Sequence, residues 1–287
     1  MDIVTTPSFF GEIGLWAVRT AVHEAAFLGH ALLLHQLIQS GAAVNTMTMD
    51  SITPLHEACT QGQAQCARLL LEAGAQVGET PSTQVDVRTV HGSTALCNAC
   101  AAGSPECAKL LLEYGATANP TLTALTATPL HEACIRGSVD CVRLMIAGGA
   151  ELETYDIYFG TPLHAACTKQ HVECARVLLN AGANVNAARF HETALHIAAK
   201  HDSVSLIQML VAFGADRRAK DGRGKRPVDY ARPGSHSAQC LDFSGRTPQN
   251  LQHLCRLALR SARGRRTLQG VSKLTVPYLL LDYLYCS

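Results

Sequence analysis

Apolar and polar positions alternate along most of the chain with the spacing of short amphipathic helices. In one stretch Cys66, Leu69 and Leu70 recur at helical intervals, and Cys107 opens the same arrangement further along the chain. Residues three and four positions apart lie on one face of a helix, so each stretch predicts a helix with one buried face. A glycine such as Gly74 follows, in the place where a left-handed residue ends a helix.

A shorter helix is predicted before each of these stretches. The run Thr-Pro-Leu-His-Glu-Ala-Cys at 53–59 begins with a good N-cap residue and a proline suited to the first helical position. Near or looser copies begin at Thr20, Thr94, Thr128, Thr161 and Thr193. The steps between the six threonines are 33, 41, 34, 33 and 32 residues, and six Gly-Ala pairs from Gly41 to Gly214 keep the same steps. Two markers in one phase predict a structural repeat.

This period and the Thr-Pro-Leu-His-x-Ala pattern resemble ankyrin repeats. We predict an all-α solenoid of six clear repeats and a partial seventh, because one unit cannot bury its apolar face without its neighbours. The predicted boundaries are 1–19 for an N-terminal capping segment, 20–49, 50–82, 91–123, 125–157, 158–190 and 191–220 for the repeats, 221–235 for the partial repeat (20–235 in all), and 236–287 for a separate C-terminal segment. Polar residues around 78–84 predict an exposed loop, either a tolerated extension or a partner contact.

Composition narrows the class of protein. Hydrophobic residues make up 47% of the 287 residues and charged residues 16%, which is unlike a disordered chain. Apolar runs long enough for a membrane span are missing from the sequence, and its start does not read as a secretory signal. We therefore expect a soluble intracellular protein with no membrane partner. The expected location is the cytoplasm, with the nucleus left open.

Cysteine and histidine recur with the repeats. Pairs such as Cys59 and Cys66 lie seven residues apart, and His56 has counterparts in four other repeats. Metal sites need clustered ligands, whereas free cysteine packs as a small hydrophobe. We interpret both residue types as structural, with the imidazoles tying loop backbone groups together. The sequence shows no catalytic constellation, so we expect neither an enzyme nor a cofactor nor a bound metal.

The C-terminal segment carries two further patterns. After Thr247-Pro248, an apolar helix face is formed by Leu251, Leu254, Cys255 and Leu259, whereas Arg256 and Arg260 lie largely off it. The second pattern comprises Leu274, Val276, Pro277, Leu280, Tyr283 and Leu284. About 50 residues are too few to bury a core alone. In order and spacing these patterns resemble a helical SOCS box, so the whole chain is similar to the ankyrin-repeat and SOCS-box family.

The resemblance implies a function. Such proteins are substrate receptors that join elongin B and elongin C, recruit cullin-five with its RING partner, and present a target for ubiquitination and degradation. Carried over by position, Leu251, Leu254, Cys255 and Leu259 bind elongin C, and Leu274, Val276, Pro277, Leu280, Tyr283 and Leu284 select the cullin. The family's cullin motif usually has a proline where this chain has Thr275, so cullin choice stays open.

Two other functions compete with this one. The C-terminal segment could simply cap a plain ankyrin interaction scaffold. Residues 1–216 carry a net charge of −9 and residues 217–287 one of +10, so a nucleic-acid adaptor is a further alternative. The basic segment has no interleaved aromatic platform for single strands, and we therefore expect no nucleic-acid partner.

The target-binding residues are expected on the positions that face outward in such stacks. The candidates are Glu24, Glu57, Glu132, Met47, Met49, Tyr155, Tyr158, Phe159 and Phe190. Exposed aromatic residues and methionines are common binding anchors. The glutamates, together with the acidic repeats, predict a target with a basic patch beside an apolar one.

Overall fold

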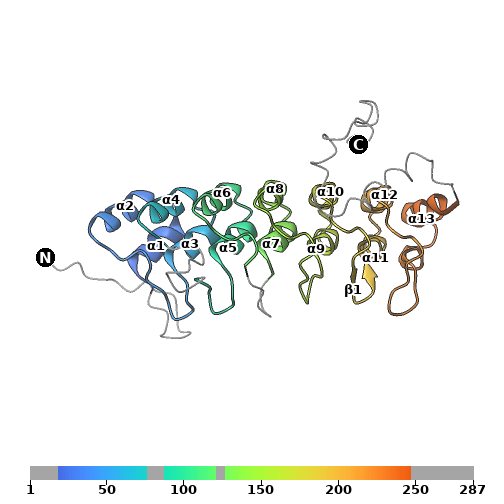
Figure 1. Ribbon diagram of the computed structural model, residues 1–287, viewed down its shortest axis with the longest axis horizontal. Helices are drawn as coiled ribbons and strands as arrows, with labels where there is room; N and C mark the ends of the chain where they lie inside the picture. The colour runs from blue at the N-terminus through green and yellow to red at the C-terminus, as the bar shows by residue number, and fades with distance from the viewer. Residues whose placement is uncertain (1–18, 76–86, 121–126, 247–287) are drawn as a thin grey trace, which may run out of the picture.

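The chain forms an elongated stack of helix pairs (Figure 1). The computed structural model describes residues 19–75, 87–120 and 127–246. The first helices of the pairs form one row and the second helices form a parallel row beside it (Figure 1). The predicted ankyrin solenoid is confirmed, with little strand in the described part.

The elements are short and regular. The first helices are α1 (Ala21–Leu28), α3 (Pro54–Thr60), α5 (Ala95–Ala102), α7 (Pro129–Arg136), α9 (Pro162–Thr168) and α11 (Ala194–Lys200). The second helices are α2 (Ala31–Gln39), α4 (Ala64–Glu72), α6 (Pro105–Glu113), α8 (Val139–Ala147), α10 (Val172–Asn180) and α12 (Val204–Ala212). The strands β1 (Ala188–Arg189) and β2 (Glu192–Thr193) pair antiparallel between α10 and α11. The 3₁₀ helix η1 (Pro227–Tyr230) and α13 (His236–Arg246) complete the described part.

The predicted threonine caps are found where the sequence places them. Thr53, Thr128 and Thr161 have extended backbone directly before α3, α7 and α9, and a proline follows each as the first helical residue. The Thr128 hydroxyl accepts the backbone N–H of His131, which satisfies one of the amides that a helix start leaves unpaired.

The core runs the length of the stack as one continuous cluster of small and branched side chains. Leu55, Leu96, Leu130, Leu163 and Leu195 are fully buried at the same position of successive first helices. The cysteines of the repeats are also buried and unpaired by disulfides, as predicted for structural thiols. Each layer therefore buries its apolar face on the next one.

Histidines link the layers. The ring Nδ1 of His131 lies 2.8 Å from the Thr128 hydroxyl of its own repeat, and Nε2 lies 2.9 Å from the carbonyl oxygen of Gly160 in the next repeat. Thr53 N–H donates to Nδ1 of His56, which assigns the ring proton to Nε2. As in His131, the ring Nε2 also reaches a carbonyl oxygen of the next repeat in His23, His164 and His196. The acceptors are Ile52, Glu192 and Lys225, at 3.0–3.2 Å. This confirms the structural interpretation of the repeated histidine.

The third repeat departs from this pattern. Cys97 replaces the histidine, and its thiol donates to the carbonyl of Ala127 at 3.7 Å. Both residue types keep their neutral forms in these buried places. Burial lowers the pKa of His56 and of His164 to about 4, and burial raises the pKa of the Cys97 thiol.

The seventh unit extends beyond the predicted residues 221–235. The 3₁₀ helix η1 packs on α11, as a first helix would, and α13 packs on both α12 and η1. In Figure 1, α13 lies next to α12 in the row of second helices. Residues 236–246, which we assigned to the C-terminal segment, therefore cover the end of the repeat stack.

Candidate functional site

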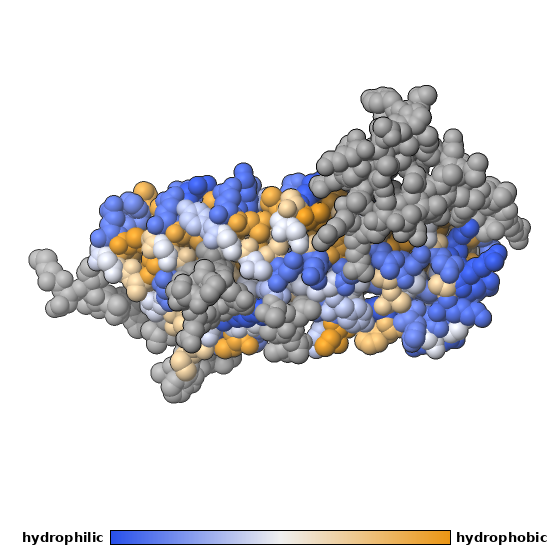
Figure 2. Space-filling view, in the orientation of Figure 1, coloured by the Kyte–Doolittle hydropathy of each residue, from blue (hydrophilic) through white to orange (hydrophobic). Residues whose placement is uncertain are grey.

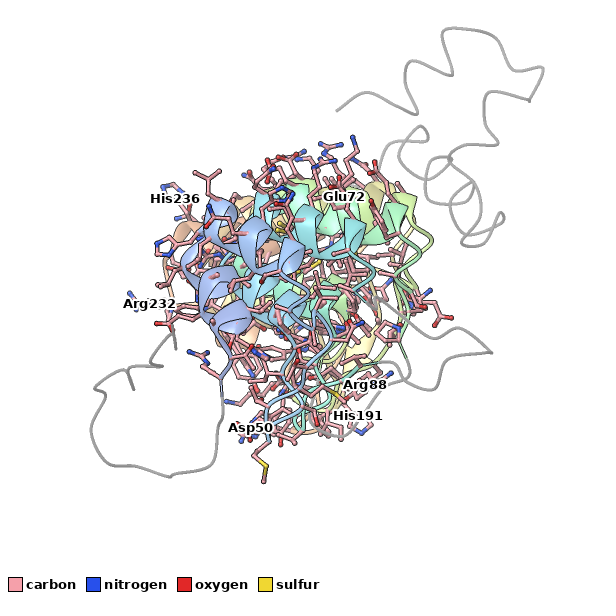
Figure 3. All side chains as sticks on the ribbon, turned by 90° about the vertical axis from the view of Figure 1, so that its left-hand side faces the viewer. Asp50, Glu72, Arg88, His191, Arg232 and His236 are labelled. Carbon is pink, nitrogen blue, oxygen red and sulfur yellow. The ribbon has the colours of Figure 1, made fainter. Side chains whose placement is uncertain are left out.

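The loops that join one repeat to the next project from the row of first helices as a series of fingers (Figure 1). Viewed along the stack, Asp50, Arg88 and His191 come from three different fingers and lie at the same edge of the molecule (Figure 3). A face built from many loops on a rigid scaffold is where binding residues are expected.

Most of the predicted aromatic and methionine candidates lie on this face. Met47 and Met49 are exposed on the finger of residues 42–52. Tyr155 and Tyr158 are exposed and Phe159 is half-buried on the finger of residues 151–160, called the Tyr158 finger below. Ile157 of the same finger is 57% exposed but was not among the predicted binding residues.

The acidic candidates are placed differently. Glu24 is exposed on α1, whereas the side chain of Glu57 is only 5% exposed and forms a salt bridge with Arg19. Glu132 is partly buried, and burial raises the pKa of its carboxyl group. The structure therefore shows no continuous exposed column of these three glutamates, and the expectation of a basic target surface loses this support.

The β1–β2 hairpin forms the next finger, residues 183–193, called the Phe190 finger below. Phe190 and His191 form its two-residue tip and have φ angles of 48° and 69°. Two-residue hairpins favour residues such as Asn-Gly that adopt positive φ easily, so bulky side chains here cost about 1 kcal/mol each. Phe190 is nonetheless 65% exposed, with the Arg189 guanidinium 5.6 Å from the centre of its ring. Such strain on an exposed aromatic residue points to binding.

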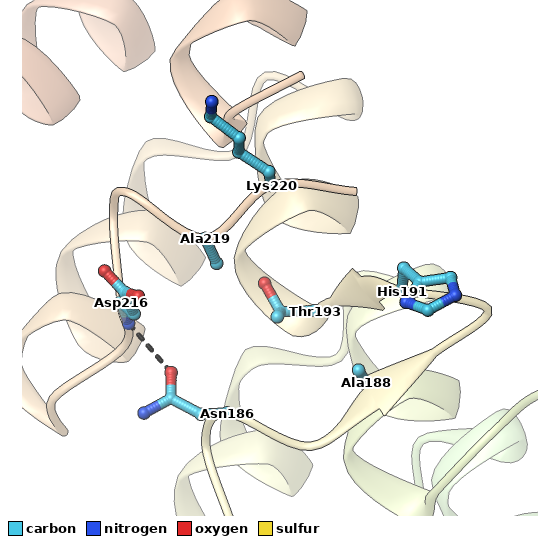
Figure 4. A pocket seen from close by; sticks show the side chains of 7 residues that line it. All are labelled: Asn186, Ala188, His191, Thr193, Asp216, Ala219 and Lys220. Atoms are coloured by element: carbon cyan, nitrogen blue, oxygen red, sulfur yellow. Dashed lines mark hydrogen bonds between the residues drawn. The ribbon is translucent and has the colours of Figure 1, made fainter. Parts of the chain in front are cut away.

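A pocket of about 330 Å³ lies between the Phe190 finger and the following loop (Figure 4). It is lined by Asn186, Ala188, His191, Thr193, Asp216, Ala219 and Lys220. The side-chain amide oxygen (Oδ1) of Asn186 accepts the backbone N–H of Asp216 at 2.8 Å, and the Asp216 carboxylate accepts the backbone N–H of Arg218 at 2.9 Å. These bonds hold the lining residues Asn186 and Asp216 in place, while His191 and Lys220 are exposed to solvent.

The last finger, residues 216–226 and called the Arg223 finger below, is strongly basic. Six of the ten residues from Arg217 to Arg226 are Lys or Arg. The single acidic residue among them, Asp221, accepts the N–H groups of Arg223 and Lys225 and the hydroxyl of Tyr230, contacts that lower its pKa to about 2. The Asp221 carboxylate is therefore satisfied by these three hydrogen bonds within the chain. Residues 217–226 were not among the predicted target-binding residues, although the density of basic side chains marks this finger.

The predicted elongin-binding and cullin-selecting residues, from Leu251 to Leu284, lie outside the described residues. Within the described part, no helix is both long and apolar enough to cross a membrane. The same residues contain no group of three or more His, Cys, Asp or Glu side chains placed to hold a metal ion.

The fold and its finger face define a class, the ankyrin-repeat proteins. A family model for ankyrin repeats matches residues 16–81, 80–156, 119–189 and 152–221, and one for the SOCS box matches residues 247–285. Ankyrin repeat and SOCS box protein 13 of Mus musculus is 57% identical over 276 residues, 96% of each chain, and that of Homo sapiens is 56% identical over the same shares. The chain belongs to the ankyrin-repeat and SOCS-box family.

Solved structures agree with this assignment. The crystal structure of the human ASB11 ankyrin repeat domain matches with a TM-score of 0.73 and 39% identity, covering 80% of this chain and all of that one. The ankyrin repeat domain of Bcl-3, a member of the IkappaB protein family, matches with a TM-score of 0.64 and 29% identity, covering 78% of this chain and 99% of that one. The second likeness shows that the stack is shared by proteins outside this family.

Proposed function

We propose that this protein is a substrate-recognition subunit of an elongin B/C–cullin-RING E3 ubiquitin ligase. The observation that carries the proposal is the SOCS-box match at residues 247–285, directly after the ankyrin stack, in a chain that matches an ankyrin repeat and SOCS box protein over 96% of its length. The protein contributes no catalytic residue of its own and acts by bringing the target to the ligase. Its location is cytoplasmic, with the nucleus as a second compartment.

The SOCS box binds the ligase components, and the ankyrin repeats bind the target. Leu251, Leu254, Cys255 and Leu259 fill an apolar groove on elongin C, which is recognition of a helix by anchors spaced along one face. Cullin-five is selected by the second pattern of the SOCS box, which comprises Leu274, Val276, Pro277, Leu280, Tyr283 and Leu284. The finger face binds the target, since it carries exposed Met49, Tyr158 and Phe190 on a rigid stack.

Co-purification with elongin B and elongin C tests the first step. The wild-type chain should form a stable complex, and Leu251→Asp with Cys255→Asp should abolish it because two charges cannot enter an apolar groove without partners. The matched control is Arg256→Asp with Arg260→Asp, which adds the same residues off the apolar face and should keep the complex. Equal loss in both variants, or no complex for the wild type, would count against the proposal.

The competing function is a plain ankyrin scaffold whose C-terminal segment only caps the stack. Helix α13 gives this alternative a specific basis, because residues 236–246 already cover α12 and η1. Removal of residues 247–287 separates the two. If the protein is a ligase receptor, the truncated chain keeps target binding and loses elongin binding. If it is a scaffold that needs the segment as a cap, the truncated chain has a lower thermal midpoint.

A further inference from the structure

The last three fingers form one continuous face. A Cβ atom placed on Gly160 would lie 2.9 Å from Cβ of Arg189, so the Tyr158 finger and the Phe190 finger are in close contact. A Cβ on Gly222 would lie 3.6 Å from the His191 ring, so the Arg223 finger packs against the other side of the same hairpin. A partner that lies across this face would touch all three fingers.

The chemistry of this face changes along the stack. The Tyr158 finger presents Ile157 and the two tyrosines on either side of it, and the Phe190 finger adds one exposed aromatic ring. The Arg223 finger then presents exposed Arg223, Lys225 and Arg226. In Figure 2, hydrophobic colour marks the lower edge of the middle of the stack, and hydrophilic colour gathers at the end that carries α11 and α12.

Part of this positive charge is engaged within the chain, because Arg226 pairs with Asp229 and Lys225 Nζ lies 5.3 Å from the centre of the Tyr230 ring. Among the described residues, Lys220 and Arg223 form no ion pair and keep their charge for a partner. Asp221 is buried and bonded to the backbone of its own finger, and Asp229 pairs with Arg226 from the side of η1. Lys220 and His191 are exposed and line the pocket of Figure 4, where the exposed Asp216 lies on the side across from His191. The Nε of Arg189, at the junction of two fingers, is buried and donates no hydrogen bond to any residue that the structure describes.

We propose that this face recognises an extended acidic segment of a target protein in which apolar residues precede or follow a cluster of carboxylates. Apolar side chains pack on Tyr158, Ile157 and Phe190, and carboxylates bind Lys220, Arg223 and Lys225. The inference rests on the proposed function in taking this face as the target-binding surface, but it names a different target chemistry from the basic patch expected from sequence.

The spacing of the two features follows from the stack. Successive helix layers lie about 10 Å apart, so the Tyr158 finger and the Arg223 finger are about 20 Å apart. An extended chain advances about 3.3 Å per residue, so about six residues separate the anchor on Tyr158 from the acidic residues, and about three separate the anchor on Phe190 from them. A segment whose apolar and acidic residues are directly adjacent can contact the Tyr158 finger or the Arg223 finger, but not both at once.

Selection from a library of random 16-residue peptides, displayed and captured by the purified full-length chain, tests the chemistry without any ligase component. Enriched peptides should carry apolar residues about three and about six positions away from Asp or Glu. Enrichment of basic residues, or no charge preference, would overturn the inference. So would tighter binding of a random-sequence single-stranded RNA than of the enriched peptides.

Variants then locate the binding. Lys220→Gln, Arg223→Gln and Lys225→Gln together should weaken the most enriched peptide at least about tenfold and flatten its dependence on salt. Arg68→Gln, Lys109→Gln and Arg143→Gln, exposed on the second helices, remove the same charge and should leave the affinity unchanged. Equal losses in the two triple variants would overturn the assignment of the face.

The strained hairpin tip supplies a second and sharper variant. Phe190→Asn with His191→Gly gives the turn the residues it prefers, so the thermal midpoint should rise or stay the same while peptide affinity falls at least about tenfold. Unchanged affinity would show that the exposed ring has no part in recognition. Because the same preparations are assayed separately for elongin binding, failure of the ligase proposal and failure of the peptide prediction are told apart.

Discussion

The buried histidines make stability depend on pH, and His164 gives the clearest test. The His164 ring is fully buried, bonded to the Thr161 hydroxyl at 2.8 Å and to the Glu192 carbonyl at 3.2 Å, and burial lowers its pKa from 6.5 to about 4. The folded state therefore holds the neutral ring, while the unfolded chain takes up a proton below pH 6.5. The stabilising effect is complete above that pH and is lost as the pH falls toward 4.

The size of the effect follows from the pKa difference. Between pH 7.5 and pH 5, a histidine that titrates near 6.5 when unfolded and near 4 when folded lowers the free energy of unfolding by about 2 kcal/mol. His164→Gln should cost about 1–3 kcal/mol at pH 7.5, where it breaks the bond between repeats. It should also remove the titration, so the two stability curves should approach each other by about 2 kcal/mol at pH 5.

Urea unfolding followed by circular dichroism at several pH values between 5 and 7.5 measures this difference. His35→Gln is the control, because His35 is exposed on α2 and the variant should follow the wild-type curve. If wild type and His164→Gln keep a constant separation over the whole range, the buried imidazole does not control the pH response and the reasoning is wrong.

Three further predictions concern single contacts. Cys97→His should raise the free energy of unfolding by about 1 kcal/mol in urea titrations, because an imidazole can make the bond between repeats that a thiol makes weakly at 3.7 Å. Gly160→Ala should lower the thermal midpoint more than Gly149→Ala. Both glycines have positive φ, but only the methyl group added at position 160 comes within 2.9 Å of the Arg189 side chain. Asp221→Ala should speed amide hydrogen exchange in the Arg223 finger, because two amides lose their acceptor; unchanged exchange would contradict this.

The repeat architecture was readable from sequence because each layer uses the same local rules. Thr53 and Pro54 cap and begin a helix by backbone chemistry that needs no distant residue. The buried leucines follow from helical periodicity in the same way. Features that repeat once per layer can be recognised even when one copy, such as Cys97, departs from the pattern.

The candidate site was harder to predict, because it depends on contacts between residues far apart in sequence. Glu57 holds a position that faces outward in the repeat pattern, yet its side chain is 5% exposed and pairs with Arg19, 38 residues earlier in the sequence. Phe190 is a bulky residue type that rarely adopts positive φ, so no local rule indicates a two-residue turn at this position. The contact of Gly222 with the His191 ring is likewise visible only in three dimensions.

The histidine links also bear on how such proteins gain and lose repeats over evolutionary time. Excision of residues 161–192 would join Gly160 to Thr193, so His131 would still meet a carbonyl directly before a threonine cap. The histidine link between repeats would be kept across the new junction, but the Tyr158 and Arg223 fingers would become neighbours. Whole repeats therefore act as interchangeable spacers, and their number sets the distance between the two ends of the finger face.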